Sequence, residues 1–447
     1  MTASVVVIGF GVTGRAVARC LLARGDDVTV FDDAPSPELV AAAGALGVSV
    51  EATPSGPELA ERLAGVTLVV PSPGVPVSHP IYRAAEIAGV PVLSEIELAS
   101  QLRPAEGPEL VAITGTNGKT TVTTLVTAML QASGRSAVAA GNIGVPLVEA
   151  VSSGTDVCVA EVSSFQLQFT ESFRPAVSCW LNLSPDHLDW HPTIGHYADA
   201  KARIWRNQRR GDTAVINADD PLVKASASTI PDGVSVIEFS IARGASYSFD
   251  GEKLRGPEGE PIIAAADLPR ALPHDIANAL AATAVASAAG ASAEGCRSAL
   301  RRAPLLPHRV SLVASSGGVE WYDDSKATTP ASVLAAVAGF KSVVLIAGGR
   351  NKGLDLGVLA SAVPPIRAVV AIGEAADEVA HAFHHVVPVQ AAGSMEEAVS
   401  IAADLAVPGD AVLLSPGCAS FDWYNSYAAR GDHFASLVES LLSKGES

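Results

Sequence analysis

The sequence predicts an α/β protein organised in three domains, and three observations carry this prediction. The chain has 447 residues, which corresponds to about three domains of roughly 150 residues each. Short runs rich in Val and Ile alternate with Ala-rich stretches along most of the chain. Hydrophobic residues make up 48% of the chain and charged residues 17%, so the composition excludes a disordered protein.

The apolar runs predict strands that are buried on both faces, because they are continuous rather than alternating, and this is typical of parallel sheets. These runs are Ser4–Ile8, Asp27–Phe31, Leu68–Val70, Leu110–Ile113, Val157–Val162, Ala214–Asn217, Val343–Ala347, Ala368–Ile372 and Ala411–Leu414. Ser240–Asp267 instead predicts turns and short antiparallel strands. Pro-rich connectors at 102–108 and 303–307 predict domains at about 1–103, 104–304 and 305–447.

Charge and hydropathy exclude two classes of partner. The 30 Lys and Arg against 47 Asp and Glu give a formal net charge of −17, which excludes duplex nucleic acid bound through a general basic surface. Ile276–Ala293 is the longest weakly polar stretch, but it consists mostly of Ala and has polar flanks. We therefore expect a helix in a soluble core and no membrane insertion.

The N-terminus and the cysteines indicate the compartment. The first residues lack the basic region of a signal peptide. The five cysteines are scattered, odd in number and without a CxxC pair, so they indicate neither a disulfide framework nor a cysteine zinc site. We expect a reduced, cytoplasmic protein.

The first Gly-rich turn has the GxGxxG pattern of a dinucleotide-binding turn. Gly9, Gly11 and Gly14 lie between a predicted strand and helix, and Asp32 follows the next strand. The pattern indicates a diphosphate better than it indicates NAD, so NAD or FAD, another nucleotide and a purely structural turn all stay open. A second loop, Ser72–Gly74, is expected at the same sheet edge.

A second Gly-rich loop is the strongest signal in the chain. Thr114–Thr121 follows a buried strand, and Gly118-Lys119-Thr120 opens a helix. The backbone can wrap phosphates, Lys119 can reach the β- and γ-phosphates, and the Thr120 hydroxyl can hold Mg²⁺. The loop departs from the strict GxxxxGK[ST] pattern, whose first glycine would fall at Ile113. A hydride-transfer enzyme does not need this loop, so the first turn becomes a nucleotide-substrate site beside a separate ATP site.

Three further polar positions follow. Glu161 ends a buried strand, where a carboxylate favours a Mg²⁺ role over a structural salt bridge. His187 and His191 are spaced as i, i+4 but lack the glutamate of HExxH, which excludes a zinc protease, and His191 is expected on a solvated loop. Lys201, considered alone, is expected on a solvated helix face.

Several motifs occur in one order along nearly the whole chain. They are Thr114–Thr120, Gly141–Pro146, Glu161–Gln166, Asn182–Asp189, Lys201, His274–Leu280, Pro307–Arg309, Asp323–Thr328, Gly348–Lys352 and Leu414–Asp422. Together they resemble the Mur ligases, the ATP-dependent amino-acid-adding enzymes of peptidoglycan synthesis, and their relatives the folylpolyglutamate synthases. The segments 163–167, 324–328 and 415–420 look like those of the D-glutamate-adding branch.

The resemblance implies an ATP-dependent ligase that joins D-glutamate to UDP-N-acetylmuramoyl-L-alanine through an acyl phosphate. It implies a Rossmann-like N-terminal domain for the UDP-sugar, a central P-loop ATPase-type domain and a Rossmann-like C-terminal domain for the amino acid. It further implies two Mg²⁺ ions and a monomer. Three alternatives are another Mur or folylpolyglutamate-type ligase, an NAD-dependent oxidoreductase using the first turn, and a non-catalytic nucleotide-binding module.

The resemblance also assigns roles to residues. Catalytic roles fall to Lys119, Glu161, His187 and Lys201. ATP contacts fall to Gly115, Thr116, Asn117, Gly118, Lys119, Thr120, Thr121, Asn278, Arg309, Asp324 and Lys326. Asn278, expected to begin an Ala-rich helix, would contact adenine. UDP-sugar contacts fall to Gly11, Val12, Thr13, Asp32, Asp33, Ser72, Gly74, Asn142 and His187. D-Glutamate contacts fall to Thr328, Lys352, Ser420, Phe421 and Tyr427. Metal ligands are Thr120, Glu161, His187 and Lys201, the last as a carbamate formed with CO₂.

Two departures from the family pattern stand out. Asp33-Ala34 occupies the place where well-known members carry Thr-Arg, so we expect an altered uracil contact. Tyr427 replaces the usual Phe, which keeps a packing role possible and adds a hydroxyl.

Overall fold

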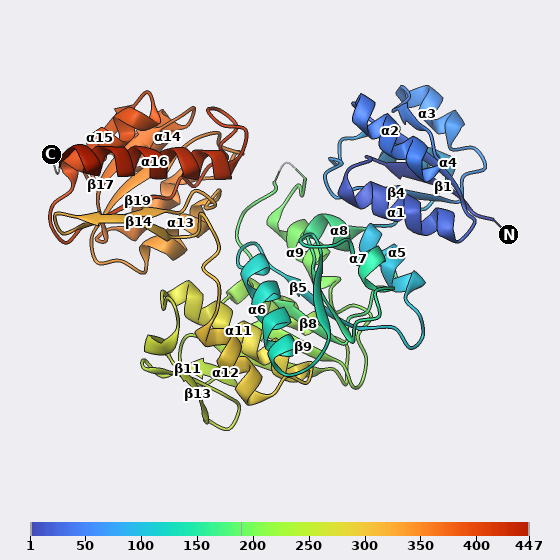
Figure 1. Ribbon diagram of the computed structural model, residues 1–447, viewed down its shortest axis with the longest axis horizontal. Helices are drawn as coiled ribbons and strands as arrows, with labels where there is room; N and C mark the ends of the chain where they lie inside the picture. The colour runs from blue at the N-terminus through green and yellow to red at the C-terminus, as the bar shows by residue number, and fades with distance from the viewer. Residues whose placement is uncertain (1, 189, 446–447) are drawn as a thin grey trace. The chain divides into compact units, whose positions relative to one another are not determined.

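The computed structural model describes residues 2–188 and 190–445, and three sheets organise them (Figure 1). The described residues form two compact units. The first unit comprises residues 2–183, 190–264 and 278–301, and the second comprises 184–188, 265–277 and 302–445. The predicted α/β class is confirmed, and every predicted strand is present to within two residues at each end.

The first sheet has four parallel strands in the order β3-β2-β1-β4. Its elements are β1 Ser4–Ile8, α1 Val12–Ala23, β2 Asp27–Asp32, α2 Pro37–Leu46, β3 Val50–Ala52, α3 Gly56–Arg62, β4 Leu68–Pro71 and α4 Pro80–Ala88. Alternate residues of β1 enter two different apolar clusters, one on each face. This is why Val5, Val6 and Val7 are apolar in succession.

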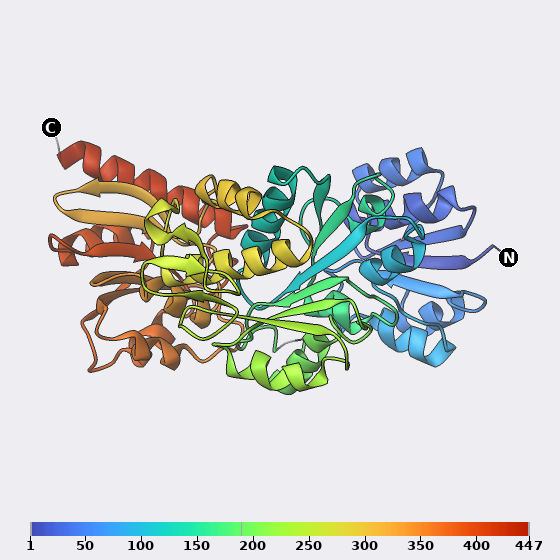
Figure 2. The same cartoon turned by 90° about the horizontal axis from the view of Figure 1, so that it is seen from below.

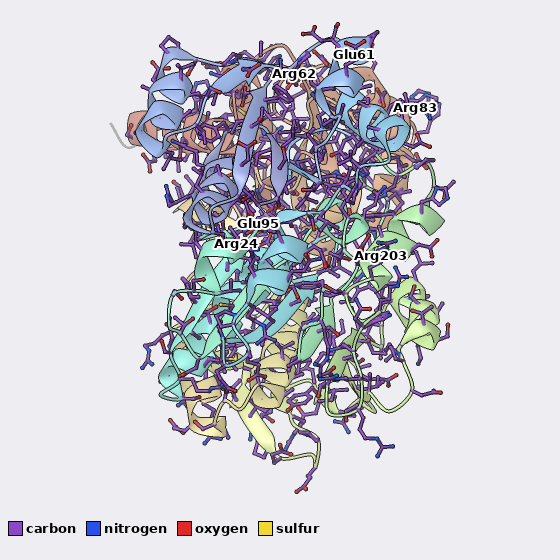
Figure 3. The ribbon with its side chains drawn as sticks, turned by 90° about the vertical axis from the view of Figure 1, so that its right-hand side faces the viewer. Arg24, Glu61, Arg62, Arg83, Glu95 and Arg203 are labelled. Carbon is purple, nitrogen blue, oxygen red and sulfur yellow. The ribbon has the colours of Figure 1, made fainter. Side chains whose placement is uncertain are left out.

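A short helix, α5 Glu95–Leu102, follows the first sheet and carries two buried carboxylates. Glu95 is labelled in Figure 3; its Oε1 accepts the N–H of Val148 at 2.7 Å, and burial raises its pKa to about 7. Glu97 accepts the N–H groups of Ser172 at 3.0 Å and Phe173 at 2.8 Å. These bonds join α5 to elements of the second sheet region.

The second sheet has nine strands in the order β13-β12-β11-β10-β9-β8-β5-β7-β6. The strands from β6 to β11 in this order pair in parallel, whereas β11, β12 and β13 pair antiparallel, as predicted for residues 240–267. Its strands are β5 Glu109–Thr114, β6 Ala137–Gly141, β7 Val157–Glu161, β8 Val177–Trp180, β9 Thr213–Asn217, β10 Ser235–Ser240, β11 Tyr247–Phe249, β12 Lys253–Arg255 and β13 Pro261–Ala264.

The helices of this region include the predicted Ala-rich one. They are α6 Lys119–Ala132, α7 Leu147–Ala150, α8 Ser164–Gln168, α9 Ile194–Ala202, α10 Pro221–Ser226, η1 Ala227–Thr229, η2 Ala265–Asp267, α11 Pro273–Ala288 and α12 Ala293–Arg301. The Ala-rich helix α11 begins at Pro273, five residues before Asn278, so the expectation that Asn278 begins it is wrong. No helix within the described residues has the length and apolarity needed to cross a bilayer.

The third sheet has six strands in the order β14-β15-β19-β16-β17-β18, and only the β14–β15 pair is antiparallel. Its elements are β14 Ser311–Ser316, β15 Val319–Asp323, α13 Pro330–Val337, β16 Val343–Gly348, η3 Leu356–Ala362, β17 Ile366–Ile372, α14 Ala376–Ala382, β18 Val389–Ala392, α15 Met395–Leu405, β19 Ala411–Leu414 and α16 Tyr427–Gly445. Residues of α13, η3 and α14 pack on one face, and residues of α15 and α16 pack on the other (Figure 2).

Candidate active site

The first Gly-rich turn is built for a close approach of backbone to ligand. Gly9 has φ +81° and donates its N–H to Phe31 O at 2.7 Å. A Cβ on Gly14 would lie 1.9 Å from Gly9 O, so only glycine fits there. Gly11 caps α1 without a side-chain acceptor, and a Cβ on it would meet no atom within 4 Å outside its chain neighbours and its own helix. A helix N-terminus of this kind favours an anionic group.

Asp32 and Asp33 both lie at the carboxyl end of β2 but have different partners. Asp32 accepts the N–H groups of Phe10 at 2.8 Å and Ala34 at 3.0 Å, which ties the Gly-rich turn to the strand end. Asp33 Oδ1 lies 3.0 Å from Nε2 of the buried His79. This hydrogen bond lowers the pKa of Asp33.

His79 is a residue of this site that the sequence analysis missed. Its Nδ1 accepts the N–H of Ile81 at 3.2 Å, so the ring proton of the neutral form is on Nε2 and is donated to Asp33. Ser72, from the second predicted loop, donates its hydroxyl to Gly9 O at 2.9 Å. The two loops are therefore joined at the sheet edge, as predicted from their positions after β1 and β4.

The second Gly-rich loop, Thr114–Thr121, is called the phosphate loop below. Two hydrogen bonds between Asn117 and Asn182 hold it in place. Asn117 N–H donates to Asn182 Oδ1 at 2.8 Å, and Asn182 Nδ2 donates to Asn117 O at 3.1 Å. Gly118 has φ +84°, and a Cβ there would lie 2.6 Å from Asn278 Oδ1. Asn278, predicted to contact adenine, thus lies beside the loop. Asn182 was part of a matched motif, but its anchoring role was not predicted.

Two lysines donate to the carbonyls of this loop. Lys119 Nζ, at the start of α6, donates to Gly115 O at 2.9 Å and Thr116 O at 3.0 Å. Lys201 Nζ, from α9, donates to Gly115 O at 2.9 Å. Lys119 and the N-terminus of α6 at this loop favour the binding of phosphates.

Lys201 is buried, so its expected place on a solvated helix face is wrong. Its exposure is 1%, its Nζ lies 3.3 Å from Thr114 Oγ1, and the amine sits 4.7 Å from the centre of the Tyr197 ring. The sequence around Lys201 is polar, but α9 packs against α8 and turns this side chain toward the loop. Tyr197 is a second residue that the sequence analysis missed.

His191 is also buried, so the expectation of a solvated loop residue is wrong. It is 3% exposed, and its Nε2 lies 2.9 Å from Ser164 Oγ. Its ring stacks on Tyr197, with centroids 5.0 Å apart, and faces Phe165 on α8. The aromatic side chains of α8 and α9 cover it, which no local pattern indicated. His191, Tyr197 and Lys201 form a continuous column beside the phosphate loop.

Glu161 has the features of a cation ligand. It ends β7 next to Ile113 of β5, is 2% exposed, and accepts Asn142 Nδ2 at 2.9 Å through Oε1. Its Oε2 is buried without a hydrogen-bond partner. Within residues 2–188 and 190–445, no three His, Cys, Asp or Glu side chains gather in a metal-binding group. Mg²⁺ commonly takes one or two carboxylates together with substrate phosphates, so Glu161 and the Thr120 hydroxyl fit such an ion.

His187 belongs to the segment 184–188, which groups with the second unit, whereas Thr120, Glu161 and Lys201 belong to the first. His187 Nε2 lies 3.3 Å from Asp186 Oδ2. Lys352 Nζ lies 3.7 Å from Asp186 Oδ1. The structure thus brings two predicted site residues to one carboxylate, and Asp186 itself was not predicted.

The remaining predicted residues lie at the edge of the third sheet where its parallel strands have their carboxyl ends. Lys326 Nζ lies 3.7 Å from the centre of the Tyr427 ring, which is consistent with a packing role for that ring. Ser420 is buried, whereas Phe421 is 62% exposed. Thr328 and Arg309 are half-buried.

Asp324 has an unusual environment for a residue expected to contact the nucleotide. It is 6% exposed and accepts Ser415 Oγ at 2.7 Å and Val310 N at 3.2 Å. Burial raises its pKa to about 7. The native state therefore binds a proton at this residue between about pH 4 and 7 that the unfolded chain has released.

We expect Asp324→Asn to stabilise the ligand-free protein at pH 8 by about 1–3 kcal/mol, because the variant removes a buried charge and keeps the shape. The gain should shrink as the pH falls toward 5, where wild-type Asp324 is protonated. Thermal unfolding of both proteins between pH 5 and 8 measures the difference. A gain in stability that is independent of pH, or a loss of stability at pH 8, would contradict the raised pKa of Asp324.

The three sheets and the Gly-Lys-Thr loop at the start of α6 define an α/β protein of the nucleotide-binding kind. Three family models match it: "Mur ligase MurD-like, N-terminal domain" over residues 3–94, "Mur ligase middle domain" over 113–286, and "Mur ligase, glutamate ligase domain" over 308–418. The chain belongs to the Mur ligase family, so the resemblance inferred from its motifs is confirmed.

Named relatives match nearly the full chain. The UDP-N-acetylmuramoylalanine–D-glutamate ligase of Frankia casuarinae is 44% identical, and the match covers 97% of this chain and 93% of the relative. The enzyme of the same name from Thermobifida fusca is 39% identical, with 98% of each chain covered.

Solved structures share the fold at low identity. The UDP-N-acetylmuramate-alanine ligase MurC from Thermotoga maritima has a TM-score of 0.59 at 20% identity and covers 98% of this chain and 99% of its own. MurF from Acinetobacter baumannii has a TM-score of 0.61 at 18% identity and covers 84% and 91%. These likenesses confirm the fold class alone.

Proposed function

We propose that this ligase joins the amino group of D-glutamate to the carboxylate of UDP-N-acetylmuramoyl-L-alanine in peptidoglycan synthesis, using ATP. The observation that carries the proposal is the arrangement around residues 114–120, where Lys119 and Lys201 donate to the same loop. The buried, unpartnered oxygen of Glu161 lies at the end of the neighbouring strand. The names of relatives that match the full chain support the choice of substrates.

The reaction needs an activated carboxylate. The γ-phosphoryl group of ATP passes to the carboxylate oxygen, the amine attacks the acyl phosphate, and phosphate leaves. In this proposal the loop backbone and Lys119 orient the phosphates, as phosphoryl transfer depends mostly on positioning and charge neutralisation. Thr120 and Glu161 would hold Mg²⁺, and the ion would neutralise charge on the phosphates. His187 would help to hold a second Mg²⁺ and the acyl acceptor.

Lys201 acts in this proposal as a carbamate. The neutral amine forms an N–C bond with CO₂ and releases a proton, which gives an anionic, carboxylate-like group. Burial disfavours a charged amine, and the exposure of 1% at Lys201 therefore supports the reaction. The carbamate oxygens are of the kind that Mg²⁺ prefers.

The remaining substrate contacts are divided among the three predicted domains. Domains at about 1–103, 104–304 and 305–447 would bind the UDP-sugar, ATP and the amino acid, respectively. The first turn, with Gly11, Val12 and Thr13, receives the UDP diphosphate, assisted by Asp32, Asp33, Ser72, Gly74 and Asn142. Asn278, Arg309, Asp324 and Lys326 complete the ATP site. Thr328, Lys352, Ser420, Phe421 and Tyr427 receive D-glutamate. We further propose that the protein is a monomer and that it works in the cytoplasm, where ATP and UDP-sugars are available.

The proposal is tested by ADP release with UDP-N-acetylmuramoyl-L-alanine and a panel of D- and L-amino acids. We expect release that depends on D-glutamate. If a different amino acid stimulates ADP release, the protein is another ligase of the family. If ADP release does not need the UDP-sugar, UDP-N-acetylmuramoyl-L-alanine is not the substrate.

We expect His79→Ala to raise the KM for the UDP-substrate about three- to tenfold with little change in kcat, because the hydrogen bond that orients Asp33 is lost. Initial rates at varied UDP-substrate measure the effect. His384→Ala, at a surface position on the third sheet region, is the control. An unchanged KM in a folded His79→Ala protein would show that Asp33 does not contact the substrate.

A further inference from the structure

A buried arginine lies where loops of the third sheet meet. Arg430, in the first turn of α16, is 2% exposed. Its Nε donates to Ser325 Oγ at 2.9 Å, and its Nη2 donates to Ser325 O at 2.9 Å and to Cys418 O at 3.1 Å. One guanidinium therefore joins the loop after β15 to the loop after β19.

A third loop packs against the same group. Gly349, which follows β16, has φ +130°, and a Cβ there would lie 3.1 Å from Arg430 Nη1 and 2.4 Å from Ala419 O. Arg350 and Ala419 exchange backbone hydrogen bonds at 2.9 and 3.0 Å. The chain that leads to Lys352 is therefore fixed against the loop of Cys418, with the guanidinium alongside.

The electrostatics of Arg430 do not suit a purely structural role. Its hydrogen-bond acceptors are a hydroxyl and two carbonyls, and its Nη1 is buried without a hydrogen-bond partner. Burial lowers its pKa to about 10, although the negative charges of Asp422 and Asp323 oppose this shift. A buried cation bonded to neutral oxygens is unfavourable for folding compared with an apolar side chain of similar size. Packing alone therefore does not account for an arginine here.

We propose that Arg430 is a positioning residue that holds the loops of residues 323–328 and 415–420 in the arrangement that receives the dicarboxylic amino acid. This inference rests on the proposed function. Ser325 lies between Asp324 and Lys326, and Cys418 lies two residues before Ser420. A shift of either bonded carbonyl therefore moves side chains that are expected to contact D-glutamate or ATP.

The test compares Arg430→Lys with wild type in the ligase assay. Lysine keeps the charge but cannot hold three acceptors in one planar geometry. We expect the KM for D-glutamate to rise about tenfold or more, and the KM for ATP to rise less. The KM for the UDP-substrate should stay within about twofold. In Arg430→Ala, millimolar guanidinium chloride should restore part of the D-glutamate affinity.

Arg367→Lys is the matched control. Arg367 lies near the amino end of β17, where it pairs with Asp410 at 2.5 Å, away from the loops of the site. The Arg367→Lys variant should have a lower thermal stability than wild type, without a selective change in any one KM.

The inference is overturned if Arg430→Lys leaves the KM for D-glutamate unchanged or raises all three KM values equally. It is also overturned if both Arg430 variants fail to fold, because the role is then structural. The wild-type response to D-glutamate in the same assay reports on the proposed function separately. If wild type prefers another amino acid, the variants are compared with that amino acid.

Discussion

Lys119→Ala is expected to lower D-glutamate-dependent ADP formation by about 10²–10³-fold, the scale of removing one preorganised charge from a transferring phosphoryl group. Lys119 is the charged side chain at the start of α6, and its Nζ lies within 3.0 Å of two loop carbonyls. Binding of the UDP-substrate should persist, because its proposed contacts lie mainly on the first sheet. Coupled ADP release and calorimetric titration of the UDP-substrate measure the two effects.

Lys224→Ala is the matched control for this variant. Lys224 is exposed on α10, and its removal should leave both measurements unchanged. Because Lys119 also bonds to the loop, thermal unfolding confirms that a loss of activity is not a loss of fold. A Lys119→Ala protein with near-normal turnover would show that the ATP site lies elsewhere.

Lys201→Arg is expected to lose most activity, by about 10²-fold or more, even though it keeps the positive charge. Arginine cannot form the proposed carbamate, and its larger head must fit a site where the lysine is 1% exposed. Lys201→Ala should be equally inactive and less stable by about 1–3 kcal/mol, since it removes a buried side chain. Formate or acetate should restore part of the rate of Lys201→Ala by occupying the vacated space.

A direct readout separates carbamate chemistry from packing. Wild-type protein equilibrated with ¹³C-bicarbonate should show a carbamate carbon signal that is absent from Lys201→Ala. Lys341→Ala, at an exposed position, should keep the signal. An active Lys201→Arg enzyme, or wild type without a carbamate signal under conditions of full activity, would refute the role.

Most of the fold could be predicted because its central strands have a strong local signal. Val343–Gly348 and Ala411–Leu414 are continuous apolar runs, as strands covered on both faces must be. The strands β6 and β8, which lie next to β7 and β5 respectively, were not predicted. Ala137–Gly141 contains only Ala, Val and Gly, and Val177–Trp180 is interrupted by Ser178. Pairing with β7, β5 and β9 places them in the sheet, and such long-range pairing is not visible in a local pattern.

The candidate site could be predicted where a motif carries the chemistry, and less well where packing decides. The Gly-rich loop, Lys119 and Glu161 have local signals. Aromatic side chains of α8 and α9 cover His191, and α9 turns Lys201 toward the loop, so the polar surroundings of both residues in the sequence indicated the wrong environment. His79 had a weak signal as a histidine directly before Pro80 at a helix start. Arg430 had none, because its acceptors are more than ten residues away in the chain.

The fate of the carboxylate oxygen tests whether the reaction passes through an acyl phosphate. UDP-N-acetylmuramoyl-L-alanine labelled with ¹⁸O in its carboxylate is incubated with the protein, ATP and D-glutamate, and the released phosphate is analysed by mass spectrometry. We expect one ¹⁸O atom in each phosphate, formed only with D-glutamate and in step with ADP, because the carboxylate oxygen leaves on the phosphoryl group. Unlabelled phosphate accompanying product formation would contradict an acyl phosphate and with it the proposed ligase mechanism.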